Sequence, residues 1–358
     1  MANHFDLAEL ALQGVCPNNH ILYDDLGYPS IMVYVPKATY ADLGLGTSTA
    51  TFPAFIINGQ EVPGIYIGKY QSIVMNNRAY SLPGVLNTSN ITLDTAIARC
   101  TAKGAGWHLM TMAEHAALML WCEQNGYMPI GNNNWGKHSS ESIYTAIPGD
   151  FENGNRRRIL TGTGPLTYYH DKSPAGIADL CGNVWEWMGG LRTVYGEVQV
   201  LINNNAADSD NSQAASSAAW MAINAADGTF ITPNGSGTTS GSVKMDYISS
   251  KITYSTSITS QSDSGRNCTF GAITCDNTIS DAAKLVLQAL CLLPKSTTVL
   301  GASHLCYFNN GAAERSFFVG GSYNGSSRGA CSFDGDYDRS NSNVPVGFRL
   351  AFAELPAA

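Results

Sequence analysis

Charged side chains are scarce in this sequence, because Asp, Glu, Lys and Arg make up only 13% of its 358 residues. A typical soluble domain contains about 25%. The formal net charge of −8 leaves little basic surface, so we expect no nucleic-acid partner. We interpret the one short basic run, residues 156–158, as a solvated turn. The polar surface must then consist mainly of Asn, Ser, Thr, Gly and Tyr.

Long apolar runs are missing as well. The most apolar stretch, residues 285–293, ends at Pro294 and is too short to cross a bilayer. The first residues contain no basic segment followed by a long apolar one, so no signal peptide is predicted. We expect a protein that is not inserted into a membrane.

Metal-binding and nucleotide-binding patterns are incomplete. The nine cysteines are scattered without any C-x-x-C pair, so no zinc site is predicted and the thiols are expected to be reduced and mostly buried. Cys268 and Cys275 are the one pair that could form a local bridge. The stretch GNNNWGKH at 131–138 approaches a phosphate-binding loop, but His138 stands where such loops carry a hydroxyl. His115 has no second ligand at metal spacing and is interpreted as a packed histidine. We expect no cofactor and no bound metal.

Lys, Glu, Gln, Met and Trp are all absent from residues 321–346. The stretch instead holds six Ser, four Gly, three Asn, three Asp and two Tyr. Tyr offers a large contact area at little cost in side-chain entropy, and Ser, Gly and Asn offer adaptable hydrogen bonds, as in antibody loops. Strand-like segments flank the stretch, which is how a scaffold holds a binding loop. An ordinary Ser- and Gly-rich surface loop is the alternative.

Composition and periodicity divide the chain into a leader, residues 1–48, and one larger domain, residues 49–358. Within the domain, residues 131–165 are predicted to form a long loop. Residues 203–265 are rich in Asn, Ala, Ser, Gly and Thr and are predicted to be a surface insertion with short strands. A helix candidate at 280–293 is apolar enough to be buried.

Two other helices are predicted near residues 93–103 and 111–125. The second has the capping-box spacing at its start, with Thr111 three residues before Glu114. Upstream, two apolar runs separated by Asn58-Gly59 are typical of a strand, a turn and a second strand.

The segment DLCGNVWEWMGGLR at 179–192 is the most distinctive motif. Gly182 and Asn183 allow a backbone with positive φ, and the two tryptophans that follow supply large apolar area. Glu186 lies between these tryptophans, so we expect it to pair with a buried donor such as Arg349.

This motif occurs in order with GWHLMTMAEHAALMLWC at 106–122, GGSY at 320–323 and GFRLAF at 347–352. The set resembles the formylglycine-generating-enzyme type of C-type lectin fold over about residues 50–353. The resemblance implies an α+β fold with short antiparallel strands, two helices and extensive loops.

Within that superfamily the sequence looks most like the variable proteins of diversity-generating retroelements, which occur in bacteriophages, prophages and bacterial genomes. In these systems a reverse transcriptase randomises adenines while it copies a template repeat into the 3′ end of the gene. An AAY asparagine codon can then become Tyr, Ser, Asp, Gly, Cys, Phe, Arg, Val or Pro, but never Lys, Glu, Gln, Met or Trp. The resemblance therefore implies a non-enzymatic ligand-binding protein with a hypervariable region at about 320–349.

The resemblance also implies a partner and a location. The expected partner is a protein or other surface receptor of a bacterial cell, bound by a phage or prophage attachment protein. Such a protein would sit in the virion, as a tail or receptor-binding component, or on the bacterial surface. A homotrimer is expected because avidity multiplies weak contacts.

Two alternative functions lie within the same resemblance. Copper-dependent oxidases of the formylglycine-generating type hold copper with two cysteines after the GGS motif, but here those positions are Gly325 and Ala330, with only Cys331 nearby. A calcium-dependent carbohydrate lectin would use oxygen ligands such as Asp334, Asp336 and Asp338. The tripeptides EPN, QPD and WND, which such lectins usually carry, are absent.

The ligand-contact surface is predicted to consist of side chains whose codons an AAY triplet can reach. Tyr323, Phe333 and Tyr337 are expected to be its aromatic anchors, and Arg328 and the aspartates are expected to set charge preference. Gly320, Gly321 and Arg349 are expected to hold the frame. The predicted contact residues are Tyr323, Asn324, Ser326, Ser327, Arg328, Phe333, Asp334, Asp336, Tyr337, Asp338, Asn341, Ser342, Val344 and Pro345.

Overall fold

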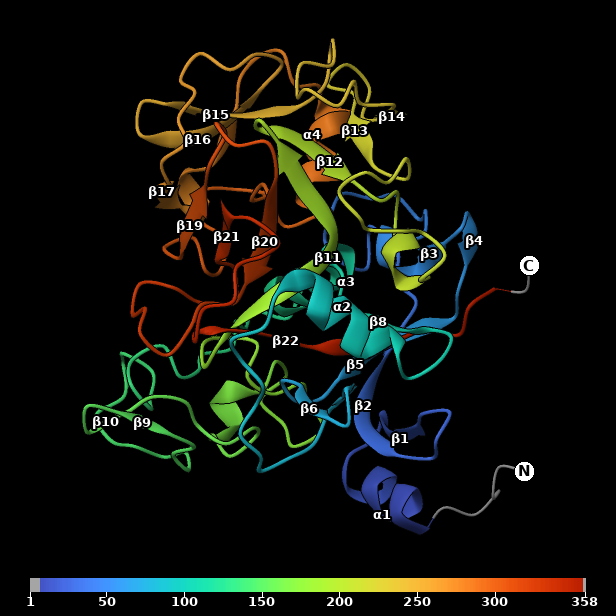
Figure 1. Cartoon of the computed structure of the whole chain (residues 1–358), viewed down its shortest axis with the longest axis vertical. Coiled ribbons are helices and arrows are strands. Elements are labelled where there is room, and N and C mark those ends of the chain that lie inside the picture. Colours follow the sequence, from blue (N-terminus) through green and yellow to red (C-terminus); the bar gives the residue numbers. More distant parts are fainter. Residues whose placement is uncertain (1–6, 357–358) are drawn as a thin grey trace.

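The computed structural model describes residues 7–356. It is a mixed α+β structure with mostly antiparallel sheets, as predicted at that level (Figure 1). The described helices are α1 (Leu7–Val15), α2 (Leu93–Thr101), α3 (Met112–Gln124) and α4 (Asp281–Gln288). None of them is long and apolar enough to span a membrane.

The two predicted central helices, α2 and α3, are confirmed, and both begin at a threonine cap. The hydroxyl of Thr92 accepts a hydrogen bond from the backbone N–H of Thr95. At α3 the Thr111 hydroxyl and the Glu114 carboxylate cap each other's backbone N–H groups, which completes the predicted capping box. Helix α3 then runs through the core, with nearly every residue buried.

Helix α4 differs from its prediction. It covers Asp281–Gln288, and only Ala283 and Leu287 are buried within it. Asp281 and Lys284 form a solvent-exposed ion pair at 2.9 Å, so one face of the helix is exposed to solvent. The burial expected for residues 280–293 therefore holds only in part: the helix itself is half in solvent, whereas residues 289–293, just beyond it, are all buried.

The smaller of the two main sheets contains strands from the first and the last part of the sequence. Its strand order is β1 (Asn19–Tyr23), β2 (Pro29–Pro36), β5 (Gly64–Gly68), β23 (Leu350–Phe352) and β8 (Trp107–Leu109), and every neighbouring pair is antiparallel. The expected leader therefore packs on the domain by extending its sheet.

The larger sheet has twelve strands, most of them in the order β17-β19-β21-β20-β11-β12-β15-β16-β18. Three of its pairings are parallel: β11 with β22, β16 with β18, and β19 with β21. Its strands are β11 (Trp185–Val194), β12 (Glu197–Val200), β13 (Met221–Ile223), β14 (Phe230–Ile231), β15 (Lys244–Ile248), β16 (Lys251–Ser255), β17 (Arg266–Thr269), β18 (Thr274–Cys275), β19 (Leu305–Phe308), β20 (Arg315–Val319), β21 (Phe333–Tyr337) and β22 (Val346–Phe348).

Part of the predicted surface insertion belongs to this sheet. Strands β13 to β16 come from residues 203–265, and the side chains of Met245, Ile252 and Tyr254 are fully buried. The region contains the short strands that we expected, but it is not confined to the surface, because Ala222 and Ile223 of β13 are also fully buried. In β15 and β16 the apolar residues alternate with polar ones, and the alternation places one face against the core.

Short hairpins complete the structure: β3 (Ile56–Ile57) with β4 (Gln60–Glu61), β6 (Ile73–Met75) with β7 (Arg78–Tyr80), and β9 (Phe151–Glu152) with β10 (Asn155–Arg156). The predicted turn at Asn58-Gly59 is confirmed, with φ of 52° and 76°. Single turns of 3₁₀ helix lie at Pro53–Phe55, Leu166–Tyr168, Asn205–Ala207 and Phe270–Ala272.

Strand β11 lies at the centre of the fold and carries the most distinctive sequence motif. Trp185 and Trp187 are buried, and the Trp187 indole N–H donates to the carbonyl of Ile91 at 2.9 Å. Between them, Glu186 accepts two hydrogen bonds from Arg349, at 2.7 and 2.8 Å. This confirms the predicted pair, which is stable in the interior because further carbonyls satisfy the remaining guanidinium protons.

The cysteines are free, and all are buried except Cys275, which is half-buried. Cys268 and Cys275 form no bridge. Cys268 instead lies opposite Cys306 in the β17–β19 pair.

Candidate ligand-binding surface

The compositionally unusual region, residues 321–346, begins and ends on strands of the larger sheet. Gly320 and Gly321 follow β20 with φ of 91° and 77°. A Cβ at Gly320 would lie 2.9 Å from the carbonyl oxygen of Leu180, and one at Gly321 would lie 2.8 Å from the Cβ of Arg328. Glycine is therefore required at both positions by backbone and by space. After a loop, the chain enters β21, makes a second loop and reaches β22.

Most of the predicted contact residues lie at the surface. Asn324, Ser326, Ser327, Tyr337, Asp338 and Ser342 are exposed, and Arg328, Asp336, Asn341, Val344 and Pro345 are half-buried. They come from the two loops and from the end of β21. Their polar and aromatic side chains present hydrogen-bonding groups and one large ring.

Three predicted contact residues are buried, so the structure corrects the expectation that they are displayed. Tyr323 is 3% exposed, Phe333 is 1% exposed and Asp334 is 6% exposed. Phe333 points into the core, where its ring lies 5.9 Å from that of Phe317. Tyr323 is covered by Trp135, with ring centroids 5.1 Å apart. The sequence identified these residues by codon, and codons carry no information about which way a side chain points.

Tyr337 is the one predicted aromatic anchor that is exposed. Its ring stacks on Phe318 at a centroid distance of 5.4 Å and an interplanar angle of 30°. Phe318 in turn packs against Trp187 and Trp185. One face of Tyr337 is therefore fixed by the core, which reduces the entropy that it would lose on contact with a ligand.

The three aspartates of β21 and its following loop have different environments. Burial raises the pKa of Asp334 to about 7, and the neighbouring Asp336 carboxylate acts in the same direction. Burial also raises the pKa of Asp336. In contrast, hydrogen bonds from Ser340 lower the pKa of Asp338.

These aspartates do not converge on one point. An Asp334 oxygen accepts from the backbone N–H of Asp336 at 3.0 Å, and an Asp338 oxygen accepts from that of Ser340 at 2.8 Å. Within residues 7–356, no group of three or more His, Cys, Asp or Glu side chains is arranged to hold a metal ion. The regular spacing of the three aspartates in the sequence therefore leads to separate local hydrogen bonds, not to one shared site.

The loop after Gly321 provides one thiol. Cys331 is buried, and its thiol donates to the carbonyl of Leu300 at 3.6 Å. Contact with the Cys291 thiol and burial hold the pKa of Cys331 well above its usual value. Gly325 and Ala330 offer no side-chain ligand for copper.

A second loop, residues 131–139, supports the first half of residues 321–346, and sequence reasoning missed this role. The Asn133 amide donates to the carbonyls of Ser326 and Arg328, at 3.3 and 3.0 Å. Asn134 forms a backbone bridge with Asn324. The backbone N–H of Trp135 donates to the carbonyl of Tyr323 at 2.6 Å. The run of asparagines before Trp135 was the available signal, because Asn often bonds to neighbouring backbone.

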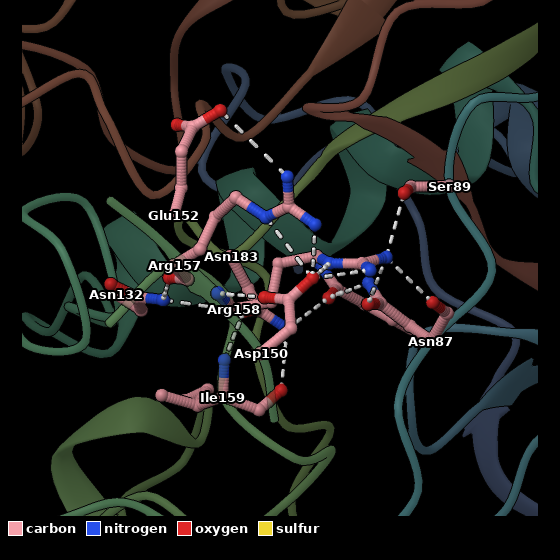
Figure 2. Close-up of polar contacts among 10 residues, drawn as sticks. Asn87, Ser89, Asn132, Asp150, Glu152, Arg157, Arg158, Ile159 and Asn183 are labelled. Atoms are coloured by element: carbon pink, nitrogen blue, oxygen red, sulfur yellow. Dashed lines mark hydrogen bonds and ion pairs between the residues drawn. The ribbon is translucent and has the colours of Figure 1, made fainter. Parts of the chain in front are cut away.

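The basic run 156–158 is not the solvated turn that we expected. Figure 2 shows Arg157 and Arg158 both turned toward the carboxylate of Asp150. Although burial opposes ionisation, the hydrogen bonds from these arginines lower the pKa of Asp150 to about 2. Arg158 is buried and also donates to the Ser89 hydroxyl at 2.6 Å. The acidic partner, several residues upstream, joins Arg157 and Arg158 in a structural ion-pair cluster.

This cluster is connected to the central motif by hydrogen bonds. Asn183, in the central motif, accepts from the Ile159 backbone N–H at 2.8 Å and from the Asn132 amide at 3.3 Å (Figure 2). Asn132 is the residue before Asn133, which holds the loop after Gly321. The central motif, the arginine cluster and the loop after Gly321 therefore form one connected hydrogen-bonded unit.

Comparison with known proteins adds little to this description. No family model matches the sequence, and no curated protein matches it. Among solved structures, Treponema denticola variable protein 1 aligns with 94% of this chain and 100% of its own, at 11% identity and a TM-score of 0.32. A TM-score this low does not establish a shared fold.

Proposed function

We propose that this chain is a non-enzymatic ligand-binding protein with a C-type lectin fold of the formylglycine-generating-enzyme type. Its region 320–349 would be a hypervariable surface diversified by a retroelement. The observation that carries the proposal is the absence of Lys, Glu, Gln, Met and Trp from residues 321–346, in a region whose polar side chains largely reach the surface.

The arrangement of the region supports this function. Strand β21 is paired on both sides, with β19 and β20, and Tyr337 at its end pairs with Ser316 of β20, which fixes its position. The loops on either side carry Ser, Asn and Asp side chains that tolerate exchange without loss of the core. A rigid scaffold that presents variable side chains is the arrangement that antibody loops use.

We propose that the partner is a protein or other surface receptor of a bacterial cell, and that the chain serves in phage or prophage attachment, on a virion or on the bacterial surface. A homotrimer is part of this proposal. It is supported by apolar side chains that the N-terminal segment leaves exposed, among them Leu7, Leu10 and Leu26.

The origin of the diversity can be tested in the neighbouring DNA. A reverse-transcriptase gene is expected beside this gene, together with a template repeat that matches the codons of about residues 320–350. The mismatches between the repeat and the gene should coincide with adenines in the repeat. Flanking DNA with neither element would contradict the retroelement origin.

The binding role can be tested with labelled protein on a panel of bacterial strains. Tyr337→Ala should weaken binding to the recognised strain by roughly 1–4 kcal/mol and change the melting temperature little, because the ring is partly exposed. Phe333→Ala, its matched control, should cost about 3–5 kcal/mol of stability because it empties a core position. Binding that survives Tyr337→Ala together with Asp338→Ala and Ser342→Ala would contradict the proposed surface.

A further inference from the structure

A groove with a volume of about 750 Å³ lies beside the turn between β11 and β12, in the part of the larger sheet that contains β15 and β16. Residues 236–241 and residues 256–258 form two of its walls. None of residues 321–346, all of which the structure describes, lines it. Strands β15 and β16 lie at the top of Figure 1, at the opposite end of the view from helix α1. We call it the hydroxyl groove, and it is separate from the candidate ligand-binding surface.

The lining of the hydroxyl groove is polar but almost free of charge. Most of its side chains are Ser, Thr or Gln. Among the lining residues, all of which the structure describes, Lys244 is the only charged one. Its side chain is buried, and its ammonium donates to the carbonyls of Thr239 and Thr256 at 2.9 and 3.1 Å. The groove therefore suits a neutral ligand that exchanges hydrogen bonds with it, because its one cation is already satisfied within the protein.

The buried Lys244 also fixes the two walls of the groove relative to each other. Thr239 belongs to the loop before β15 and Thr256 to the loop after β16, and the ammonium bonds to both. Glu197 stands opposite Lys244 in the β12–β15 pair. It is fully buried and accepts from the Ser242 hydroxyl at 2.7 Å and from the Thr239 backbone N–H at 3.0 Å. Because the walls are held in place before a ligand arrives, little affinity would be lost to ordering them.

Tyr195 supplies the aromatic side chain of the groove. It occupies the turn between β11 and β12 and is 38% exposed. Its φ of 47° is a conformation that a bulky residue rarely adopts. Gly237 packs so closely against this turn that a Cβ there would lie 2.8 Å from the Cβ of Tyr195. The surroundings thus hold the ring at the groove in spite of an unfavourable backbone, and such positions are concentrated at functional sites.

Some hydroxyls of the lining are used within the protein, and others face outward. Those of Ser236 and Thr238 bond to the side chain of Asn234. Ser240 and Ser257 are exposed, and their hydroxyls make no hydrogen bond within the described residues 7–356. The groove therefore offers an aromatic face together with hydroxyls that can both donate and accept.

We propose that the hydroxyl groove binds a neutral saccharide. The apolar face of a sugar ring would pack on Tyr195, and the hydroxyls of the sugar would bond to Ser240 and Ser257. A peptide is a poorer occupant, because Ile258 is the one aliphatic side chain among the lining residues that the structure describes. The site lies apart from residues 320–349, so this inference does not rest on the proposed function.

The test measures binding of the full chain to five tetrameric probes by isothermal titration calorimetry. Maltotetraose, chitotetraose and mannotetraose are the neutral saccharides, tetragalacturonate is the acidic one and tetraalanine is the peptide. Tyr195→Asn removes the ring, and asparagine tolerates positive φ better than most residues. Tyr195→Phe keeps the ring. Tyr28→Asn, at an exposed tyrosine outside the groove, is the matched control, and the melting temperature of every variant is measured.

At least one neutral tetrasaccharide should bind with a Kd below about 1 mM. Tyr195→Asn should weaken that binding about tenfold or more, whereas Tyr195→Phe and Tyr28→Asn should stay within about threefold. If Tyr195→Asn lowers the melting temperature, Ser240→Ala with Ser257→Ala replaces it and should weaken binding about threefold or more. Failure of all three neutral saccharides to bind, equal or tighter binding of tetragalacturonate or tetraalanine, or saccharide binding that survives these substitutions would overturn the inference. Each of these outcomes leaves the proposed function intact, because that function is tested at Tyr337 on bacterial strains.

Discussion

Individual side chains of residues 321–346 lie in two different environments, the core and the surface. Phe333 and Asp334 open strand β21 inside the protein, whereas Tyr337 ends it in solvent. Diversification of this region would therefore alter the core at its first strand residues and the surface at its last ones. We expect tolerated variants to keep a large apolar residue at position 333.

The buried Asp334 should make stability depend on pH. Burial raises its pKa to about 7, above the value of an unfolded aspartate, so the folded protein retains a proton that the unfolded chain releases. Its contribution to stability is present below about pH 4 and is lost as pH rises toward 7. Asp334→Asn should therefore stabilise the protein by roughly 1–4 kcal/mol at pH 8 and change little at pH 4, as measured by urea unfolding.

Asp338→Asn provides the control of opposite sign. Hydrogen bonds from Ser340 lower the pKa of Asp338, so its carboxylate stabilises the fold above its unfolded pKa and loses that effect as pH falls. This variant should be slightly destabilised at pH 8 only. Equal effects of Asp334→Asn at both pH values would show that its carboxyl is not protonated in the folded protein.

Among the elements, the first helix and the strands that follow it differ in how much they contribute to the fold. Helix α1 has no buried residue, whereas β2 pairs with both β1 and β5 and carries Met32, which is fully buried in one cluster with Trp187 and Phe348. Met32→Ala should cost about 2–5 kcal/mol of stability. Leu10→Ala should stay within about 0.5 kcal/mol. Thermal melting of both variants would check the contrast, and a similar loss in both would mean that α1 packs on the domain.

For the whole molecule, the exposed apolar residues of the N-terminal segment predict self-association. Light scattering at micromolar concentration should give three times the chain mass of 38.1 kDa. Leu10→Glu with Leu26→Glu should shift the mass to that of one chain, because it places charges in a surface that would be desolvated. Met75→Glu, at an exposed apolar position outside this segment, is the control. A single-chain mass for the unaltered protein would remove the trimer from the proposal.

Local patterns in the sequence determined the features that depend on neighbouring residues. The capping box at Thr111, the turn at Asn58-Gly59 and the burial of Trp185 and Trp187 followed from spacing and composition, and all are confirmed. The Glu186–Arg349 pair was also predictable, because a carboxylate between two buried tryptophans requires a cation. The composition of residues 321–346 gave the location of the candidate surface.

Only the tertiary structure decided which of those residues reach the surface. Tyr323 is buried because a loop nearly two hundred residues upstream in sequence covers it, and Phe333 is buried because its ring packs against Phe317 in the core. The basic run at 156–158 became an ion-pair cluster because the chain turns back on Asp150 (Figure 2). Residue type and codon are properties of one position, whereas burial depends on what the rest of the chain places beside it.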